Sequence, residues 1–214
     1  MREVRRAEDR FLTRVDGIST RHSFSHGAHY DPSNVGFGPL VAINVEHVAP
    51  GAGYDHHRHA DVEIVTWVVD GVLAHADTVG NDGQVRPGTA QRLSAGTGVE
   101  HAERNASDEP LVFVQTMLFS THGGEPRYAS VDVVGDGLLP GVDVAAPARM
   151  LVVRPTGTAL ELPAAPRTLV HVTRGSVDVG GERLEVGDEL RTDEPVGPVD
   201  GSGEALVWLL DTAP

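Results

Sequence analysis

The sequence predicts an all-β protein that forms two β-barrels in one chain, with few short helices. Short runs of β-branched and other apolar residues recur along the 214 residues, and clusters of turn-forming residues separate them. Glycine (25) and proline (14) are abundant, which favours strands joined by tight turns over long helices. No helical periodicity longer than a few turns competes with this pattern.

The first half of the chain predicts an N-terminal barrel over residues 1–130. Residues 1–40 mix polar and aromatic residues and end in Tyr30–Pro39, which is dense in Gly, Pro, Asn and Asp and is typical of a loop. Turn signals such as Asp70-Gly71 and Pro87-Gly88 separate the runs that follow. The strands expected in this half are 40–48, 62–69, 71–76, 91–93 and 111–119.

The second half predicts a smaller barrel over residues 149–214. Residues 131–148 are small and rich in Gly and Pro, so we expect them to be a linker between the barrels. The strands expected after the linker are 151–153, 168–173, 176–179, 183–186 and 205–210. Both halves place a strand before a glycine (Gly71, Gly175), then a hairpin, which indicates an internal duplication.

Composition excludes several classes of function. The chain has no cysteine, so neither a disulfide framework nor a thiolate metal site can form. A formal charge of −14 argues against direct nucleic-acid binding, which requires Lys and Arg to neutralise phosphates. The charged N-terminus lacks the pattern of a signal peptide, and no run reaches the ~20 apolar residues of a membrane span. We therefore expect a cytoplasmic protein without membrane contact.

Two short polar segments carry the chemistry that the sequence predicts. His57 and His59 are two residues apart just before a strong strand, and His101 and Glu103 are two apart further along the chain. Residues i and i+2 of a strand point to the same face, so each pair converges, whereas His56 should face away. If the two segments are neighbouring barrel walls, three imidazoles and a carboxylate meet inside the barrel.

A metal ion resolves the cost of burying these four groups. Polar and charged side chains in an apolar interior are unfavourable unless something pairs with them. The mixed nitrogen and oxygen set suits Fe, Ni, Cu, Mn or Zn. The sequence therefore predicts one divalent transition metal held by His57, His59, His101 and Glu103.

These segments resemble the motifs of the cupin superfamily. The first motif, G-x5-H-x-H-x3,4-E-x6-G, fits at Gly51, His57, His59, Glu63 and Gly71, except that the last gap is seven. The second motif, P-x-G-x2-H-x3-N, fits at Gly98, His101 and Asn105, with Gly96 in place of the proline.

More narrowly, the chain resembles the pirin family over most of residues 20–119. The residues that carry this resemblance are Arg21–Pro32, Val48–Gly53, His57–His59, Glu63–Thr66, Pro87-Gly88, Ser94–Gly98 and His101–Glu103. After residue 130 only the strand pattern and the length support it.

The pirin resemblance implies a bicupin whose N-terminal barrel binds iron through the residues matching His57, His59, His101 and Glu103. It favours Fe(II), with Ni, Mn, Cu or Zn as alternatives, and a C-terminal barrel without metal. Glu63 stays open as an alternative ligand or as a group that orients a ligating histidine.

The resemblance also implies a quercetin 2,3-dioxygenase-type activity on a small aromatic or enol substrate with O2. Glu103 is then the candidate catalytic base as well as a ligand. Two alternatives remain open. One is a non-oxidative cupin isomerase, cyclase or decarboxylase, and the other is a redox-sensing regulatory protein that binds a protein partner.

Several other side chains have weaker assignments. His22, His26 and His29 are candidates for the mouth of the metal pocket. His75 is expected to be a packing or surface residue, and His171 an ordinary structural histidine. Trp67 and Trp208 are expected in strand cores, whereas Phe24 and Tyr30 fit either a core or a rim.

Overall fold

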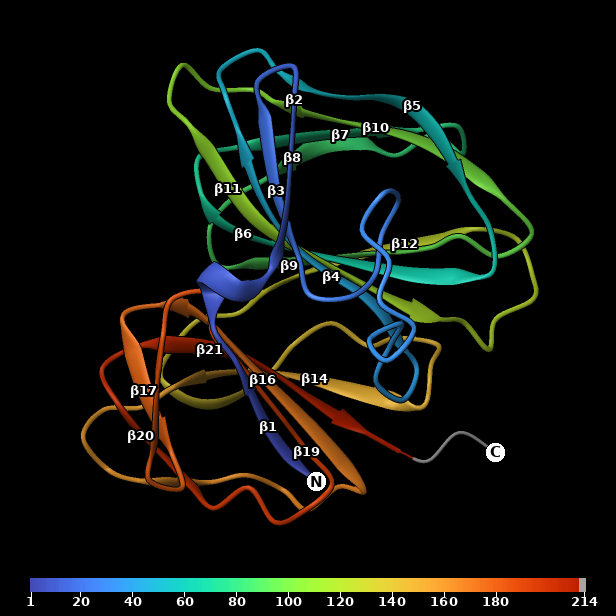
Figure 1. Ribbon diagram of the computed structural model, residues 1–214. Coiled ribbons are helices and arrows are strands. Elements are labelled where there is room, and N and C mark those ends of the chain that lie inside the picture. The colour runs from blue at the N-terminus through green and yellow to red at the C-terminus, as the bar shows by residue number, and fades with distance from the viewer. Residues whose placement is uncertain (212–214) are drawn as a thin grey trace. The chain divides into compact units, whose positions relative to one another are not determined.

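The computed structural model describes residues 1–211 and consists almost entirely of β-strands (Figure 1). Within these residues the helical structure is a single 3-10 turn, η1 (Ala7–Asp9). The same range contains no helix with the length and apolar character needed to span a bilayer. The all-β prediction is confirmed.

The chain divides into two compact units. The N-terminal unit comprises Phe11–Asp132 and Val144–Ala146. The C-terminal unit comprises Met1–Arg10, Val133–Asp143 and the chain from Pro147 onward. Each unit has two antiparallel sheets.

Two sheets form the N-terminal unit. The larger has seven strands in the order β12 (Arg127–Asp132), β9 (Thr89–Ser94), β6 (Val62–Asp70), β11 (Leu111–Phe119), β4 (Leu40–Val48), β3 (Ile18–His22) and β2 (Phe11–Val15). The smaller has four strands in the order β5 (Gly53–His59), β10 (Val99–Asn105), β7 (Leu73–Asp77) and β8 (Asp82–Val85). Apolar side chains from both sheets form one buried cluster, in which Val68 and Phe113 of the larger sheet meet Leu73 and Val85 of the smaller. The sheets therefore enclose a common interior, as in a barrel.

The C-terminal unit repeats this plan. Its larger sheet has six strands in the order β1 (Arg2–Arg5), β19 (Glu189–Thr192), β16 (Arg167–Arg174), β21 (Glu204–Leu210), β14 (Ala148–Arg154) and β13 (Gly137–Pro140). Its smaller sheet has the order β15 (Leu160–Glu161), β20 (Pro198–Gly201), β17 (Ser176–Val179) and β18 (Glu182–Glu185). The core between them is aliphatic and includes Val170, Val177, Leu184 and Val207.

The two units share one topology, as the sequence repeat predicts. The order β9-β6-β11-β4 in the first matches β19-β16-β21-β14 in the second, and β5-β10-β7-β8 matches β15-β20-β17-β18. Gly71 and Gly175 occupy equivalent turns with positive φ angles of 81° and 59°. At Gly71 a side chain would also meet the backbone, since its Cβ would lie 2.9 Å from the Cα of Leu111.

The boundaries expected from composition differ from the structure at two places. Residues 2–5 form β1, which pairs with β19 and so belongs to the C-terminal unit. The expected linker 131–148 contains β13, which pairs with β14 and places Leu138 against the C-terminal core. Both strands are short and lie at sheet edges, where Pro140 is tolerated because no further strand requires its missing N–H.

The first forty residues also contain a hairpin that the sequence pattern does not indicate. Strands β2 and β3 pair through a turn in which Asp16 and Gly17 both have positive φ, 45° and 81°. This two-residue turn matches the twist of the strands that it joins. The hairpin places Thr20 and His22 beside strand β4, on the wall of a cavity inside the N-terminal unit.

Candidate metal centre

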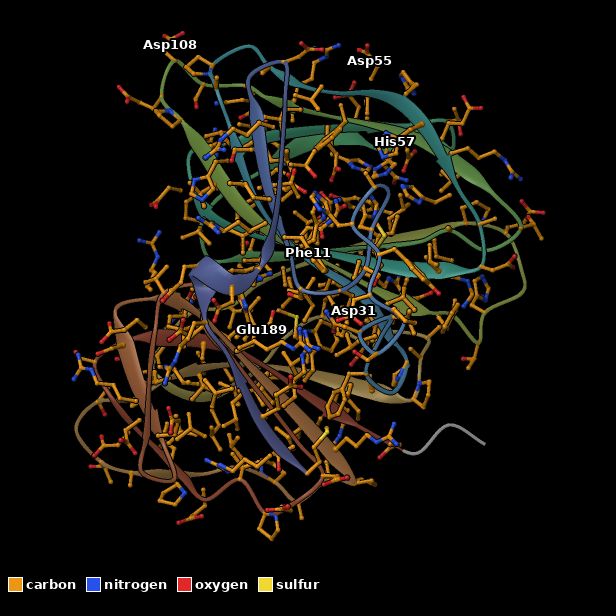
Figure 2. The ribbon with its side chains drawn as sticks, viewed as in Figure 1. Phe11, Asp31, Asp55, His57, Asp108 and Glu189 are labelled. Carbon is orange, nitrogen blue, oxygen red and sulfur yellow. The ribbon has the colours of Figure 1, made fainter. Side chains whose placement is uncertain are left out.

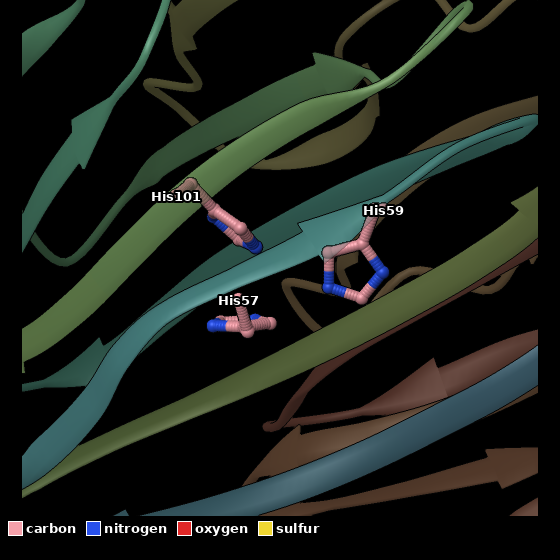
Figure 3. A group of neighbouring side chains, drawn as sticks. All are labelled: His57, His59 and His101. Atoms are coloured by element: carbon pink, nitrogen blue, oxygen red, sulfur yellow. The ribbon is translucent and has the colours of Figure 1, made fainter.

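Two neighbouring strands hold the three predicted imidazoles. His57 and His59 are on β5, His101 is on β10, and His101 is directly opposite His57 in the register. Figure 3 shows the three rings pointing toward one another from these adjacent strands. One ring nitrogen of each residue lies within 4.8 Å of one from each of the others. The alternation of side chains along the strands therefore brings these residues together, while His56 is exposed.

The ring nitrogens are available to a ligand. His57 Nδ1 donates a hydrogen bond to the Asp55 carbonyl at 2.8 Å, which leaves Nε2 as the acceptor nitrogen. His59 Nε2 and both ring nitrogens of His101 are buried and have no hydrogen-bond partner within residues 1–211. Unpaired polar nitrogens in an interior cost free energy, which a bound ion would offset.

Burial keeps two of these imidazoles neutral near pH 7. It lowers the pKa of His59 to about 4, and the nearby His57 ring acts in the same direction. It lowers the pKa of His101 to about 3, assisted by His57, His59 and His75. Neutral imidazole is the form that ligates metals, so the three side chains fit a divalent transition ion of the kind that nitrogen and oxygen donors select.

Glu103 adds a carboxylate to this centre through a second, overlapping group. Its side chain groups with His75 and His101, again with ligand atoms within 4.8 Å, and all three are buried. Gln115 Nε2 donates to both carboxylate oxygens at 2.9 Å. Burial raises the pKa of Glu103 to about 7, although hydrogen bonds from Gln115 and Thr66 act in the opposite direction. Glu103 can thus exchange a proton near neutral pH.

His75 is a member of the cluster that sequence reasoning does not identify. It is buried rather than at the surface, and its ring centroid lies 5.4 Å from that of His101. Gln91 Nε2 donates to His75 Nδ1 at 3.2 Å, and His75 Nε2 faces Asp77 at 3.4 Å. The spacing of His75 and Asp77, two apart on one strand, is the sequence pattern that could have indicated this role. The pairing of their strand with β10, which carries His101, is known only from the fold.

Glu63 has a different role from the one expected of it. It is fully buried on β6, and its carboxylate accepts hydrogen bonds from Ser94 at 2.8 Å, Ser120 at 2.7 Å and the Ala145 N–H at 3.1 Å. No histidine within the described chain is bonded to it, so it does not orient a ligand. It instead joins β9 and the segment at Ala145 to β6.

A cavity of about 400 Å³ adjoins the imidazoles. Its wall includes His57, His59, Glu103 and Gln115, together with residues of the β2–β3 hairpin and of β4. Its other lining residues include Val15, Ile18, Thr20, His22, His26, Asn44, Glu46, Tyr54 and Met117. Figure 2 shows His57 inside the ribbon of the N-terminal unit, with the exposed Asp55 at its outer edge. The volume is within the range typical of sites for small molecules.

A β-bulge brings Tyr54 to the same cavity. The register between β5 and β10 shifts between His101 and Glu103, so that Glu103 is opposite Tyr54 while His101 is opposite His57. Tyr54 and His57 are three residues apart and would face opposite sides of a regular strand. The extra residue of the bulge reverses this alternation, which places the phenol and the imidazole on one wall.

The remaining candidate residues differ in whether they contact the cavity. His22 and His26 line the cavity, whereas His29 is outside its wall and stacks on Phe11. His171 is buried and pairs with Glu189 at 3.2 Å, consistent with a structural role. Trp67, Trp208 and Phe24 are buried, and Tyr30 is exposed.

Comparisons with known proteins agree with this architecture. The sequence model of the family described as Pirin matches residues 4–118. A Mycobacterium tuberculosis protein, named provisionally as a quercetin 2,3-dioxygenase, is 38% identical over 96% of this chain and 93% of its own. The Escherichia coli K12 protein named quercetin 2,3-dioxygenase is 30% identical over 99% of this chain and 98% of its own.

Solved structures give the same result for the fold. The bacterial pirin YhhW from Escherichia coli, in complex with nickel(II), has a TM-score of 0.91 at 28% identity and covers 100% of both chains. A quercetin 2,3-dioxygenase from Acinetobacter baumannii has a TM-score of 0.74 at 20% identity, and the match covers 98% of this chain and 85% of that one. At this identity the similarity shows a shared fold alone.

Proposed function

The chain belongs to the pirin family and has its bicupin fold, and from this premise we propose that it is a metal-dependent dioxygenase that opens flavonol-like substrates with O2. The observation that carries the proposal is the convergence of His57, His59 and His101, next to a cavity whose wall includes His57, His59 and Glu103. The names of the Escherichia coli and Mycobacterium tuberculosis relatives support the reaction class.

We propose that His57, His59, His101 and Glu103 hold the metal. Their donor atoms, three imidazole nitrogens and a carboxylate oxygen, are the set that Fe, Ni, Mn, Cu and Zn accept. We favour Fe(II), and the nickel(II) in YhhW makes Ni the first alternative to examine. When bound, such an ion would supply Lewis acidity toward an enol oxygen and a route for electrons between substrate and O2.

The protein's own groups then hold the substrate and move its proton. Glu103, a buried carboxylate on the cavity wall, would accept the proton of the substrate hydroxyl. Gln115 donates to both oxygens of Glu103 and so fixes the plane of the carboxylate. Val15, Ile18 and Met117 give the cavity an apolar surface that suits a flat aromatic molecule and displaces water from it.

An oxygen-uptake assay tests the proposal. Protein purified without oxygen and loaded with Fe(II), Ni(II), Mn(II) or Cu(II) is mixed with quercetin and O2. We expect loss of the flavonol absorbance with release of one carbon monoxide per flavonol consumed. Failure of all four loaded forms to consume flavonol contradicts the dioxygenase assignment.

Two further measurements would support the alternatives instead. Turnover of an enol substrate without O2 indicates an isomerase, cyclase or decarboxylase that uses the metal as a Lewis acid. Metal-dependent retention of a protein partner without turnover of any flavonol indicates a regulatory, redox-sensing role.

A further inference from the structure

A second carboxylate lies on the wall of the cavity, apart from the predicted ligands. Glu46 is on β4 and is only 3% exposed, yet it lines the same cavity as His57, His59 and Glu103. Its strand neighbour Asn44 lines the cavity too, as alternation along β4 requires. Burying a carboxylate in an apolar interior costs free energy, so the groups around Glu46 indicate its role.

Within residues 1–211, only one of the two carboxylate oxygens of Glu46 accepts a hydrogen bond. Oε2 accepts hydrogen bonds from the Thr20 hydroxyl at 2.5 Å and the Tyr54 hydroxyl at 2.8 Å. Neither of these hydrogen bonds from described residues involves Oε1. Two donors from different strands therefore fix the orientation of the carboxylate, while its second oxygen remains an acceptor toward the cavity.

Glu46 and Glu103 face the same space from two sides. Glu103 is opposite Tyr54 in the β5–β10 register, and Tyr54 bonds to Glu46. The negative charge of Glu103 contributes to raising the pKa of Glu46 to about 7, after the larger effect of burial. The cavity therefore offers two carboxylates, one among the imidazoles and one away from them, with the apolar side chains of Val15, Ile18 and Met117 also on its wall.

We propose that Glu46 is a specificity-determining residue that accepts a hydrogen bond from a second hydroxyl of the substrate, distinct from the one held beside Glu103. This inference rests on the proposed function and narrows its substrate class to planar enols that carry at least one further hydroxyl. Thr20 and Tyr54 act through Glu46, because their hydroxyls hold its carboxylate in the orientation that binds. An enol without the second hydroxyl would bury Oε1 unsatisfied and bind more weakly.

Binding to a redox-inert form of the protein tests this without turnover. Zn(II)-loaded protein is titrated under nitrogen with quercetin and with 3-hydroxyflavone, which has a single hydroxyl, and the absorbance shift of each flavonol gives its Kd. We expect wild-type protein to bind quercetin at least tenfold more tightly than 3-hydroxyflavone. Glu46→Leu should weaken quercetin binding roughly tenfold and change 3-hydroxyflavone binding less than twofold, as for loss of one hydrogen bond to a charged group.

Two further variants separate a binding role from a folding role. Glu46→Gln keeps the volume and a neutral acceptor, so its loss of quercetin binding should be smaller than that of Glu46→Leu. Thr20→Val leaves Glu46 in place but removes one of its two hydrogen-bond donors. We expect the affinity for quercetin to fall about threefold and that for 3-hydroxyflavone to stay unchanged, as for loss of one weak hydrogen bond. The matched control is Glu109→Gln, an exposed glutamate outside the cavity wall, which should change neither Kd.

The outcomes distinguish this inference from the proposed function. If folded Glu46→Leu and Thr20→Val proteins keep the wild-type preference for quercetin, or lose affinity for both flavonols equally, the role of Glu46 is refuted and the dioxygenase proposal stands. If wild-type protein binds neither flavonol, both proposals fail together. In turnover, the same role requires that Glu46→Gln raise KM for quercetin and leave kcat nearly unchanged.

Discussion

His101 is the residue on which both groups of candidate ligands depend. Its two ring nitrogens are buried without hydrogen bonds to the described residues, and it belongs to both converging sets. His101→Ala should therefore reduce metal content from about one ion per chain to near zero, as measured by elemental analysis after dialysis. His57→Ala and His59→Ala should behave alike. The control His56→Ala, an exposed neighbour on the same strand, should retain its metal.

His75 is expected to tune the centre without being required for it. Its ring packs 5.4 Å from His101 and is itself held by Gln91 and Asp77. Groups that orient a ligating side chain typically contribute 10- to 100-fold in metal affinity. His75→Ala should weaken metal binding by that factor in competition with a chelator, whereas His122→Ala, outside both ligand groups and the cavity wall, should not. Equal affinities for wild type and His75→Ala would exclude this role.

Glu46 makes the stability of metal-free protein depend on pH in a defined direction. Its folded-state pKa is raised to about 7 from a reference value of 4.5, so protonation stabilises the folded state. This contribution is complete below about pH 4.5 and is lost as the pH rises through 7. At 1.36 kcal/mol per pKa unit, the loss is about 3 kcal/mol. Urea denaturation at pH 5 and pH 8 should show a smaller drop in unfolding free energy for Glu46→Gln than for wild type. Equal drops for wild type and Glu46→Gln would contradict this role of Glu46.

Alternation along strands explains which site residues the sequence can predict. His57, His59, His101 and Glu103 occur as pairs two apart, so the sequence alone predicts that each pair shares a face. Tyr54 could not be assigned to that face, because a bulge that no residue pattern announces changes its side. The role of Glu46 could not be predicted either, because it depends on Thr20, which lies 26 residues away in the sequence on the β2–β3 hairpin.

At the scale of elements, the pairing of β5 with β10 holds the imidazoles in register. Gly53 begins β5, and a side chain there would overlap the Glu103 carbonyl and approach the Arg104 Cα to 2.6 Å. Gly53→Ala should push the strands apart, lower the unfolding free energy by about 1–3 kcal/mol, and weaken metal binding. Gly83→Ala in β8 is the control, since nothing lies within 4 Å of its added carbon. Unchanged melting temperature and metal affinity in Gly53→Ala would refute the argument.

Long apolar strands were predictable and short edge strands were not. Strands β4 and β11 have the bounds that hydrophobic pattern predicts, 40–48 and 111–119. By contrast, Arg2–Arg5 is charged and Gly137–Pro140 contains two poor strand formers, so neither has the composition of a strand. Both become strands because a neighbouring strand, β19 or β14, offers them an unpaired edge.

At the scale of the whole molecule, a buried ion network stabilises the C-terminal unit. Glu189 contacts Arg191 at 2.9 Å, His171 at 3.2 Å and Arg10 at 3.6 Å, and all four are buried. Burial alone would raise the pKa of Glu189. The nearby Arg10, His171 and Arg191 instead hold this pKa well below its usual value. Glu189→Gln leaves two guanidinium groups buried without this carboxylate.

The expected cost of that change is about 3–5 kcal/mol of unfolding free energy, measured by urea denaturation at pH 7. The control is Glu185→Gln, which breaks only the exposed pair with Arg183 and should cost less than about 1 kcal/mol. Metal content should stay near one ion per chain in folded Glu189→Gln protein. A cost similar to that of the control would mean that the network contributes little to stability.

The pairing of β1 with β19 also has a consequence for biosynthesis. Residues 2–5 leave the ribosome well before their partner, Glu189–Thr192, which follows more than 180 residues later in the chain. At typical rates of about 5–20 residues per second, β1 waits on the order of ten to forty seconds without its ladder. The charged side chains of β1 are Arg2, Glu3 and Arg5, and Arg6 adjoins them. We expect these charges to keep the unpaired segment hydrated and to disfavour its pairing with the edge strand of another nascent chain.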